Sequence, residues 1–430
     1  MAGGLPTEYK ADAGSVEIEE IKITTFTGGN PQDITHLVMG MDVYESLENY
    51  TLSCDIFVTE GIDLLNFLPA GAEEKITFSI KTPQSGKKII YNFFVESITD
   101  IQGNDMSTMA SYVLRCVSQD AIKNSKTLYT KRYKDMEYID ALDEVCKKDL
   151  GISKGLDKPD PTKGFFDYAV NRVRPFQVID LICERSVSAK YKGSEYIFYE
   201  DNEMYRFLTI EYLIETRKPK AKAFQFEYPN AKRNDPAEER LSHRTILKYE
   251  ILDQGDDMNK IKVGAHRNKY VEFDILHGDY VFKQEYINTS HHMLFQKTDS
   301  PHDTHSTPYN SYAEAEPGFV RLALKDGTRP EMQINKNMHY KTGFRHKVFT
   351  YGMNIRVYGD TNLMVGDLIE LKIPEITGTT VEPPEQETYS GNYIVRSIRH
   401  LIEKRKEGQG QFEHFMILDC RRPNLKKELG

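Results

Sequence analysis

Four histidines lie close enough together in the sequence to suggest metal chemistry. Imidazole nitrogens are common zinc ligands, and a structural zinc site takes four ligands in all. These histidines stand, however, in an irregular polar stretch that contains no cysteine and no HExxH frame, so a solvated loop is the favoured interpretation. We therefore predict no metal and no cofactor. The four are His291, His292, His302 and His305.

Other patterns that carry chemistry are incomplete. Asp256 and Asp257 are adjacent carboxylates, but neighbouring side chains usually point apart, which favours a loop or a helix start. Residues 84–88 approach a phosphate-binding loop, yet Lys81 stands where its first glycine belongs and Lys88 where its hydroxyl belongs. No nucleophile elbow and no catalytic residue is predicted.

The five cysteines favour simple burial. No two of them form a CxxC pair and their number is odd, which argues against a disulfide framework or a zinc site. Most lie in apolar-patterned segments, where a free thiol behaves as a small hydrophobic group. They are Cys54, Cys116, Cys146, Cys183 and Cys420.

Charge and composition exclude further classes. The chain has 430 residues, of which 39% are hydrophobic and 28% charged, a balance typical of folded proteins. Its formal charge of −9 disfavours tight binding to nucleic acid. No apolar run is long enough to cross a membrane, and residues 1–14 lack a signal-peptide pattern, so synthesis in a cytoplasm is expected. For the basic runs, solvation is favoured over DNA contact. These runs are residues 404–406, 421–422 and 426–427.

The elements that position these residues begin as strands. Apolar and polar residues alternate over residues 15–118, with turns rich in Gly, Pro and Asn between the alternating runs. A slip in the alternation at Glu19–Glu20 predicts a bulge. Strands of this length and spacing predict a small barrel or sandwich. The predicted strands are 16–23, 52–58, 76–80, 89–101 and 112–117.

The pattern changes to mixed α and β over residues 119–220. Apolar residues from Ile139 to Leu150 fall near helical spacing, and Gly151 is well placed to end that helix. Pro175 begins a second predicted helix. Two short strands are predicted at 195–199 and 206–212.

From residue 221 the pattern returns to β. Residues 288–343 interrupt this pattern with a polar, irregular stretch. The predicted domain order is therefore a barrel, an insert, and a second barrel that contains an irregular insertion. The last two predicted strands form an antiparallel hairpin. The predicted strands are 247–252, 269–275, 280–287, 347–358, 369–373, 392–403 and 412–419.

Three stretches go beyond general patterning: residues 246–274, residues 362–371 with a Gly-Asp pair before an apolar strand, and residues 390–400 with the form Gly-x-Tyr-x-Val-x-x-x-x-His. In their order they resemble the central hub proteins of contractile phage baseplates, and the related late-control and secretion-system spike proteins. The Gly-Asp pair also suits an ordinary turn, and residues 288–343 have no counterpart in the resemblance. The residues that carry the motifs are Gly366, Asp367, Gly391, Tyr393, Val395 and His400.

The resemblance implies a fold class that is mainly β with α+β inserts, in which two tube-like β-barrel domains carry inserted smaller domains. The expected segments are an N-terminal arm (1–14), a first tube-like barrel (15–118), an α+β insert (119–220), a second barrel (221–287 and 344–421), an irregular insertion (288–343) and a C-terminal tail (422–430).

The resemblance also implies a structural, non-enzymatic role. Three copies would form a pseudo-sixfold ring between the hexameric tail tube protein and the trimeric central spike protein. Other baseplate proteins and the tape-measure protein are further expected partners, and DNA would pass through without specific binding or any membrane contact. The expected location is the virion tail baseplate, assembled in the host cytoplasm. Five acidic side chains would line the lumen or rim of this ring, or they would lie on its solvated outer face. They are Glu17, Glu19, Glu20, Glu73 and Glu74.

Three alternatives stay open at this point. The chain would serve as the hub of a contractile secretion or injection particle, as a receptor- or glycan-binding tail module, or as a hydrolase that uses the region of His291–His305. The sequence ends soon after its last predicted strand, without a lysozyme-like domain or a repetitive needle, so we expect puncture to belong to a separate spike protein.

Overall fold

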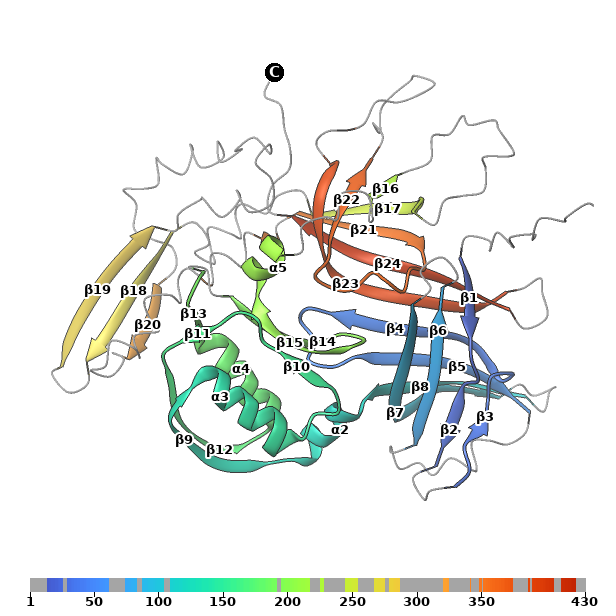
Figure 1. Ribbon diagram of the computed structural model, residues 1–430, viewed down its shortest axis with the longest axis horizontal. Coiled ribbons are helices and arrows are strands. Elements are labelled where there is room, and N and C mark those ends of the chain that lie inside the picture. The colour runs from blue at the N-terminus through green and yellow to red at the C-terminus, as the bar shows by residue number, and fades with distance from the viewer. Residues whose placement is uncertain are drawn as a thin grey trace, which may run out of the picture.

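The protein is described from a computed structural model (Figure 1). The residues described are 14–25, 29–61, 74–82, 87–103, 109–191, 195–216, 225–227, 244–253, 267–274, 278–286, 320–324, 341, 348–349, 351–373, 386, 389–405 and 411–422.

Most strands belong to one 14-stranded sheet, and the predicted fold class, mainly β with smaller α+β inserts, is confirmed. The strands of this sheet are β1 (Ser15–Ile18), β2 (Lys22–Thr24), β3 (Gln32–Asp33), β4 (Val38–Ser46), β5 (Ser53–Glu60), β6 (Lys75–Lys81), β7 (Lys88–Gly103), β8 (Ala110–Ser118), β16 (Gln225–Glu227), β17 (Ile246–Asp253), β21 (Tyr351–Tyr358), β22 (Leu368–Lys372), β23 (Gly391–Lys404) and β24 (Phe412–Arg422).

The strands of the N-terminal part of the chain close into a ring with the last two strands, β23 and β24. From β4 the order runs through β5, β8, β7, β6 and β1 to β24, and β24 returns through β23 to β4. We call these strands the first β unit. β16, β17, β21 and β22, together with the remaining parts of β23 and β24, form the second β unit.

The hairpin of β23 and β24 belongs to both units, as Figure 1 shows where the red strands lie against the blue ones. Burial alternates along β24, because successive side chains of a strand point to opposite faces. Ile402 and Phe412 pack into the core of the first unit. Ile398 and Leu418, further along the same hairpin, pack into the core of the second. The predicted hairpin is confirmed, and it is shared between the two units.

A mixed α and β insert follows the first unit and has a core of its own. Gly151 adopts a left-handed conformation (φ 60°) and ends a π-helical turn, as predicted. Pro175 begins α4. The insert contains α2 (Gln119–Lys126), β9 (Tyr129–Glu137), α3 (Tyr138–Asp143), the π-helix (Glu144–Leu150), β10 (Gly155–Asp157), β11 (Thr162–Lys163), β12 (Phe165–Val173), α4 (Pro175–Arg185), β13 (Val187–Ser188), β14 (Tyr196–Glu200), β15 (Met204–Thr209) and α5 (Ile210–Thr216).

The strand predicted at residues 206–212 ends early. β15 stops at Thr209, and Ile210–Tyr212 open the helix α5 instead. The reason is local: the hydroxyl of Thr209 accepts the amide N–H of Tyr212 at 3.2 Å, which is the N-cap bond that starts a helix.

A separate three-stranded sheet holds the strands predicted at 269–275 and 280–287. β18 (Arg267–Asp274) pairs with β19 (Asp279–Tyr286) in an antiparallel register and with β20 (Val320–Leu324) in a parallel one. These residues, expected in the second barrel, therefore pair outside it. β20 also lies within the stretch predicted to be irregular, where only a long-range pairing partner makes a short apolar run a strand.

Several contacts join the insert to the first unit, and its last helix also packs into the core of the second unit. The amide of Leu52 donates to Oε2 of Glu200 at 2.9 Å, and the rings of Tyr50 and Phe176 lie 5.0 Å apart. Glu200 is buried and also pairs with Lys154 at 2.8 Å, so its charge is neutralised inside the protein.

We predict that the first unit depends on the C-terminal hairpin for its stability. Ile402→Ala should lower the free energy of unfolding by about 2–5 kcal/mol, because it opens a cavity in a core that lies far away in sequence. Ile90→Ala is the matched control, since Ile90 is 56% exposed. Urea denaturation measures both variants. Equal losses would contradict the shared-hairpin assignment.

Candidate functional site

Three residues of the family-like motifs meet at the start of β22. Gly366 has a left-handed conformation (φ 83°) that favours glycine. Its amide donates to the carbonyl of Val395 at 2.8 Å, and the amide of Val395 donates to the carbonyl of Asp367 at 2.9 Å. The carboxylate of Asp367 accepts the amide of Met364 at 2.9 Å. The Gly-Asp pair is thus a turn that fixes where β22 enters the sheet.

The motif residues Gly391 and Tyr393 lie at the start of β23, beside a buried cation. Gly391 is paired with Leu371, and the hydroxyl of Tyr393 donates to the carbonyl of Tyr389 at 2.7 Å. Burial raises the pKa of Tyr393 to about 12. The guanidinium of Arg422 lies 5.1 Å from the centre of the Tyr393 ring. The hydrogen bond of Tyr393 and its contact with Arg422 hold the first residues of β23 in place.

Arg422 was predicted to be solvated within a basic run, and that prediction is wrong. Its side chain is only 1% exposed, and its Nη1 donates to the carbonyl of Ser390 at 2.9 Å. Arg421 pairs with Asp419 at 2.6 Å and Arg405 with Glu413 at 2.8 Å. The strand β24 continues to Arg422, which carries this arginine into the protein instead of into a solvated tail.

His400, the last motif residue, belongs to a fully buried polar cluster that joins the two β units. Its Nδ1 lies 2.9 Å from Nε2 of His414, and its Nε2 lies 3.5 Å from Oε1 of Glu45. Tyr91 donates to the same carboxylate oxygen at 3.4 Å. Burial, and then the neighbouring His400, holds the pKa of His414 well below its usual value. We name Glu45, Tyr91, His400 and His414 the junction cluster.

Sequence reasoning found one member of the junction cluster and missed the others. Both histidines occupy inward-facing positions of the hairpin, two residues apart in pairing register. That signal was present in the alternation of β23 and β24. Glu45 and Tyr91 come from distant strands, so nothing local connected them to the hairpin.

A GxSxG spacing was missed at residues 151–155, and the structure shows that it is not a nucleophile elbow. An elbow places its serine between a strand and a helix, whereas Ser153 follows the π-helix and precedes β10. The hydroxyl of Ser153 donates to Oδ2 of Asp120 at 2.7 Å, and the hydroxyl of Tyr205 donates to the same oxygen at 2.9 Å. These bonds close a turn around a buried carboxylate.

The predicted acidic residues differ in their surroundings. Glu17, Glu19 and Glu20 are exposed, and each pairs with a lysine. Glu74 is buried, and Glu73 lies outside the described residues. The exposed members of the set are therefore the three near the N-terminus. The paired lysines are Lys81, Lys88 and Lys22, in the same order.

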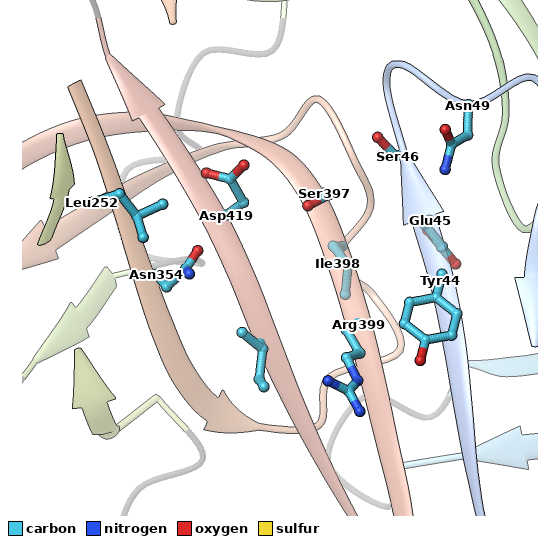
Figure 2. Close-up of a pocket in the computed structure, with 11 residues that line it drawn as sticks. Tyr44, Glu45, Ser46, Asn49, Leu252, Asn354, Ser397, Ile398, Arg399 and Asp419 are labelled. Atoms are coloured by element: carbon cyan, nitrogen blue, oxygen red, sulfur yellow. The ribbon is translucent and has the colours of Figure 1, made fainter. Parts of the chain in front are cut away.

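A hollow of about 420 Å³ opens where β4, β23 and β24 lie side by side (Figure 2). Tyr44 and Arg399 stand together in it, with the guanidinium 5.6 Å from the ring centre. Arg399 pairs with Asp42 at 2.7 Å, and burial raises the pKa of Tyr44 to about 12. Asp419 is paired with Arg396 at 3.4 Å as well as with Arg421. These charges are paired with one another, so the hollow suits hydrogen-bonded contact better than acid–base catalysis.

Several sequence candidates lie outside the described residues: the four histidines at 291–305, the pair Asp256 and Asp257, and most of the 84–88 run. Four cysteines are buried and Cys183 is partly buried, as predicted. In the part of the chain described here, no cluster of three or more His, Cys, Asp or Glu side chains could hold a metal ion. Within the same ranges, no helix is both long and apolar enough to cross a membrane.

No family model matches the sequence, and no curated protein matches it. Solved structures do match its fold. The tail protein of Neisseria meningitidis MC58 is 10% identical, with a TM-score of 0.56 over 94% of this chain and 96% of that one. The 43 kDa tail protein of prophage MuSo2 from Shewanella oneidensis is 10% identical, with a TM-score of 0.51 over 94% of this chain and 98% of that one.

The fold is therefore that of tail proteins. More particularly, this chain shares it over nearly its whole length with a tail protein of a prophage. The resemblance to tail hub proteins predicted from the sequence is confirmed at the level of the fold. The match includes the insert as well as the two β units, because 94% coverage leaves few residues outside it.

The junction cluster leads to a prediction about Gly359, which follows β21. A Cβ added at Gly359 would lie 2.0 Å from Nδ1 of His414, so Gly359→Ala should lower the free energy of unfolding by about 1–3 kcal/mol. Gly155→Ala is the control, since a Cβ there would lie 4.0 Å from its nearest neighbour. Urea denaturation compares the two variants. Equal free energies of unfolding would show that the His414 ring moves away from residue 359 at little cost.

Proposed function

We propose that this protein is a structural, non-enzymatic hub of a contractile phage tail baseplate. Three copies form a ring with pseudo-sixfold symmetry, which adapts the hexameric tail tube to the trimeric central spike and leaves a channel for DNA. The observation that carries the proposal is the tail-protein fold, shared over 94% of the chain.

The arrangement of the two β units supports this symmetry argument. Each unit is a β structure with its own core, and the shared hairpin holds them side by side. Three copies of a chain with two such units would present six β faces around one axis. A ring of this kind meets sixfold symmetry on one side and threefold symmetry on the other by shape alone.

The proposed partners are other copies of the chain, the tail tube protein and the central spike protein, with other baseplate proteins and the tape-measure protein around them. The protein would reside in the virion tail after assembly in the host cytoplasm. DNA would only pass through. The net charge of −9 supports this, because an acidic protein repels phosphate, and the exposed Glu17, Glu19 and Glu20 neutralise the lysines beside them.

The mass of the purified protein in solution tests the proposal. We expect a homotrimer, or a complex of three chains with three spike chains when the spike protein of the same particle is added. Light scattering at several protein concentrations distinguishes this from unspecific association. A stable monomer that ignores the spike would overturn the hub and favour a receptor- or glycan-binding module. Co-purification with the sheath and spike of a secretion particle would instead assign it to that machine.

The acidic surface makes a second prediction. A triple variant with Glu17→Gln, Glu19→Gln and Glu20→Gln should bind DNA at low salt, because the lysines paired with these residues lose their carboxylate partners. Binding should weaken as salt rises, since it releases condensed counterions. Gel-shift measurements with duplex DNA read the effect.

The control removes the same number of charges from the exposed surface of the insert. It combines Asp135→Asn, Glu137→Gln and Asp140→Asn. The wild type and this control should stay free of DNA under the same conditions. DNA binding by both triple variants would show that net charge matters and that the position of Glu17, Glu19 and Glu20 does not.

A further inference from the structure

The two histidines of the junction cluster allow a limited number of ring protons. Two neutral imidazoles carry two N–H groups, and one of these must lie in the 2.9 Å contact between Nδ1 of His400 and Nε2 of His414. The second lies nearest an acceptor if it sits on Nε2 of His400, which is 3.5 Å from Oε1 of Glu45, although this approach is too long to count as a hydrogen bond. In this arrangement Nδ1 of His414 carries only a lone pair.

Nδ1 of His414 lies against backbone. It is buried and has no hydrogen-bond partner, and a Cβ on Gly359 would lie 2.0 Å from it. The chain on either side is held in place: Gly359 donates its amide to the carbonyl of His414 at 2.8 Å, and the amide of His414 donates to the carbonyl of Gly14 at 2.8 Å.

A third ring proton has one place to go, whichever histidine formally takes it. With the shared position and Nε2 of His400 filled, the added N–H must stand on Nδ1 of His414. There it meets Gly359 and no acceptor. A buried charged donor without a partner is strongly unfavourable, so the contact between His414 and Gly359 must open to let water reach the proton.

We propose that the His400–His414 pair is an acid-sensitive joint between the two β units, which is closed when the pair is neutral and opens at the Gly359 contact when the pair gains a proton. The inference does not depend on the proposed role in a tail. The groups that face the pair are the carboxylate of Glu45 from β4 and, beyond it, the phenol of Tyr91 from β7. The segment after β21 and the chain before β1 contribute backbone only, through Gly359 and Gly14.

The direction of the pH dependence follows from proton counting. The pKa of His414 is lowered in the folded chain by burial and by His400, while in the unfolded chain it is ordinary, about 6.5. Below about pH 6.5 the unfolded chain therefore binds more protons, and stability falls until the pH reaches the lowered pKa. Above about pH 7 the lowered pKa of His414 makes no pH-dependent contribution to stability.

Thermal unfolding at pH 7.5 and pH 5.5 tests the joint with a matched pair of variants. Wild type should lose about 2–4 °C more than His414→Gln, whose amide can still donate to Nδ1 of His400 but cannot take up a proton. His36→Gln is the control, because His36 is exposed, and it should keep the full loss. An equal loss in wild type and His414→Gln would overturn the proposal.

A measurement on the unchanged protein covers the case in which His414→Gln does not fold. Hydrogen–deuterium exchange at the histidine C2 position, read by mass spectrometry across pH, follows the titration of each ring. His414 should titrate well below the usual pKa of a histidine, and backbone exchange around Gly359 should rise over the same pH range after correction for intrinsic rates. An ordinary titration of His414, or unchanged protection at Gly359, would overturn the joint.

Discussion

The antiparallel pairing of β23 with β24 is the interaction on which the rest of the structure depends. One end of this hairpin closes the first β unit by pairing with β4 and β1, and the other end forms the middle of the second unit. Ile402 therefore packs among residues from the first part of the chain, while Leu418 packs in the other core. Closing a loop of this length has an entropic cost that grows only slowly with length, but the first unit cannot complete its ring before the C-terminal strands are present. The two units are consequently parts of one cooperative structure.

Polar contacts also make this arrangement specific at the seam, by which we mean the region around the β23–β24 hairpin where the two β units meet. Hydrophobic packing alone tolerates a shift of two residues along a strand, because such a shift keeps every side chain on its face. The contact between His400 and His414, and the approach of His400 to Glu45, exist in one register only. Thr361 adds a second fixed point, since its hydroxyl lies 2.9 Å from that of Thr82 and donates to the carbonyl of Lys87. Buried polar groups that lose their partners are expensive, so these contacts disfavour alternative pairings.

A rigid seam also suits the proposed role. A ring that matches two symmetries needs a constant angle between its two β units, because an interface formed by one copy must be reproduced by the next. The seam provides that angle through backbone pairing and not through a linker. The insert is joined to this arrangement as well, because its Ile210 and Leu213 pack with Ile398 of the hairpin in the core of the second unit. The position of the insert relative to the two β units is therefore fixed by packing as well.

The sequence by itself determined the local elements and the class of fold. Alternation of apolar residues located most strands, Gly151 and Pro175 marked helix ends, and the spacing of Gly366, Tyr393 and His400 pointed to the tail-protein fold, because these signals depend on near neighbours in the chain. Tertiary structure alone decided the sharing of the hairpin, the pairing of β18 with β20 and the burial of Arg422. Each of these depends on a partner far away in sequence, and a local pattern carries no information about which distant strand, core or carbonyl will lie beside it.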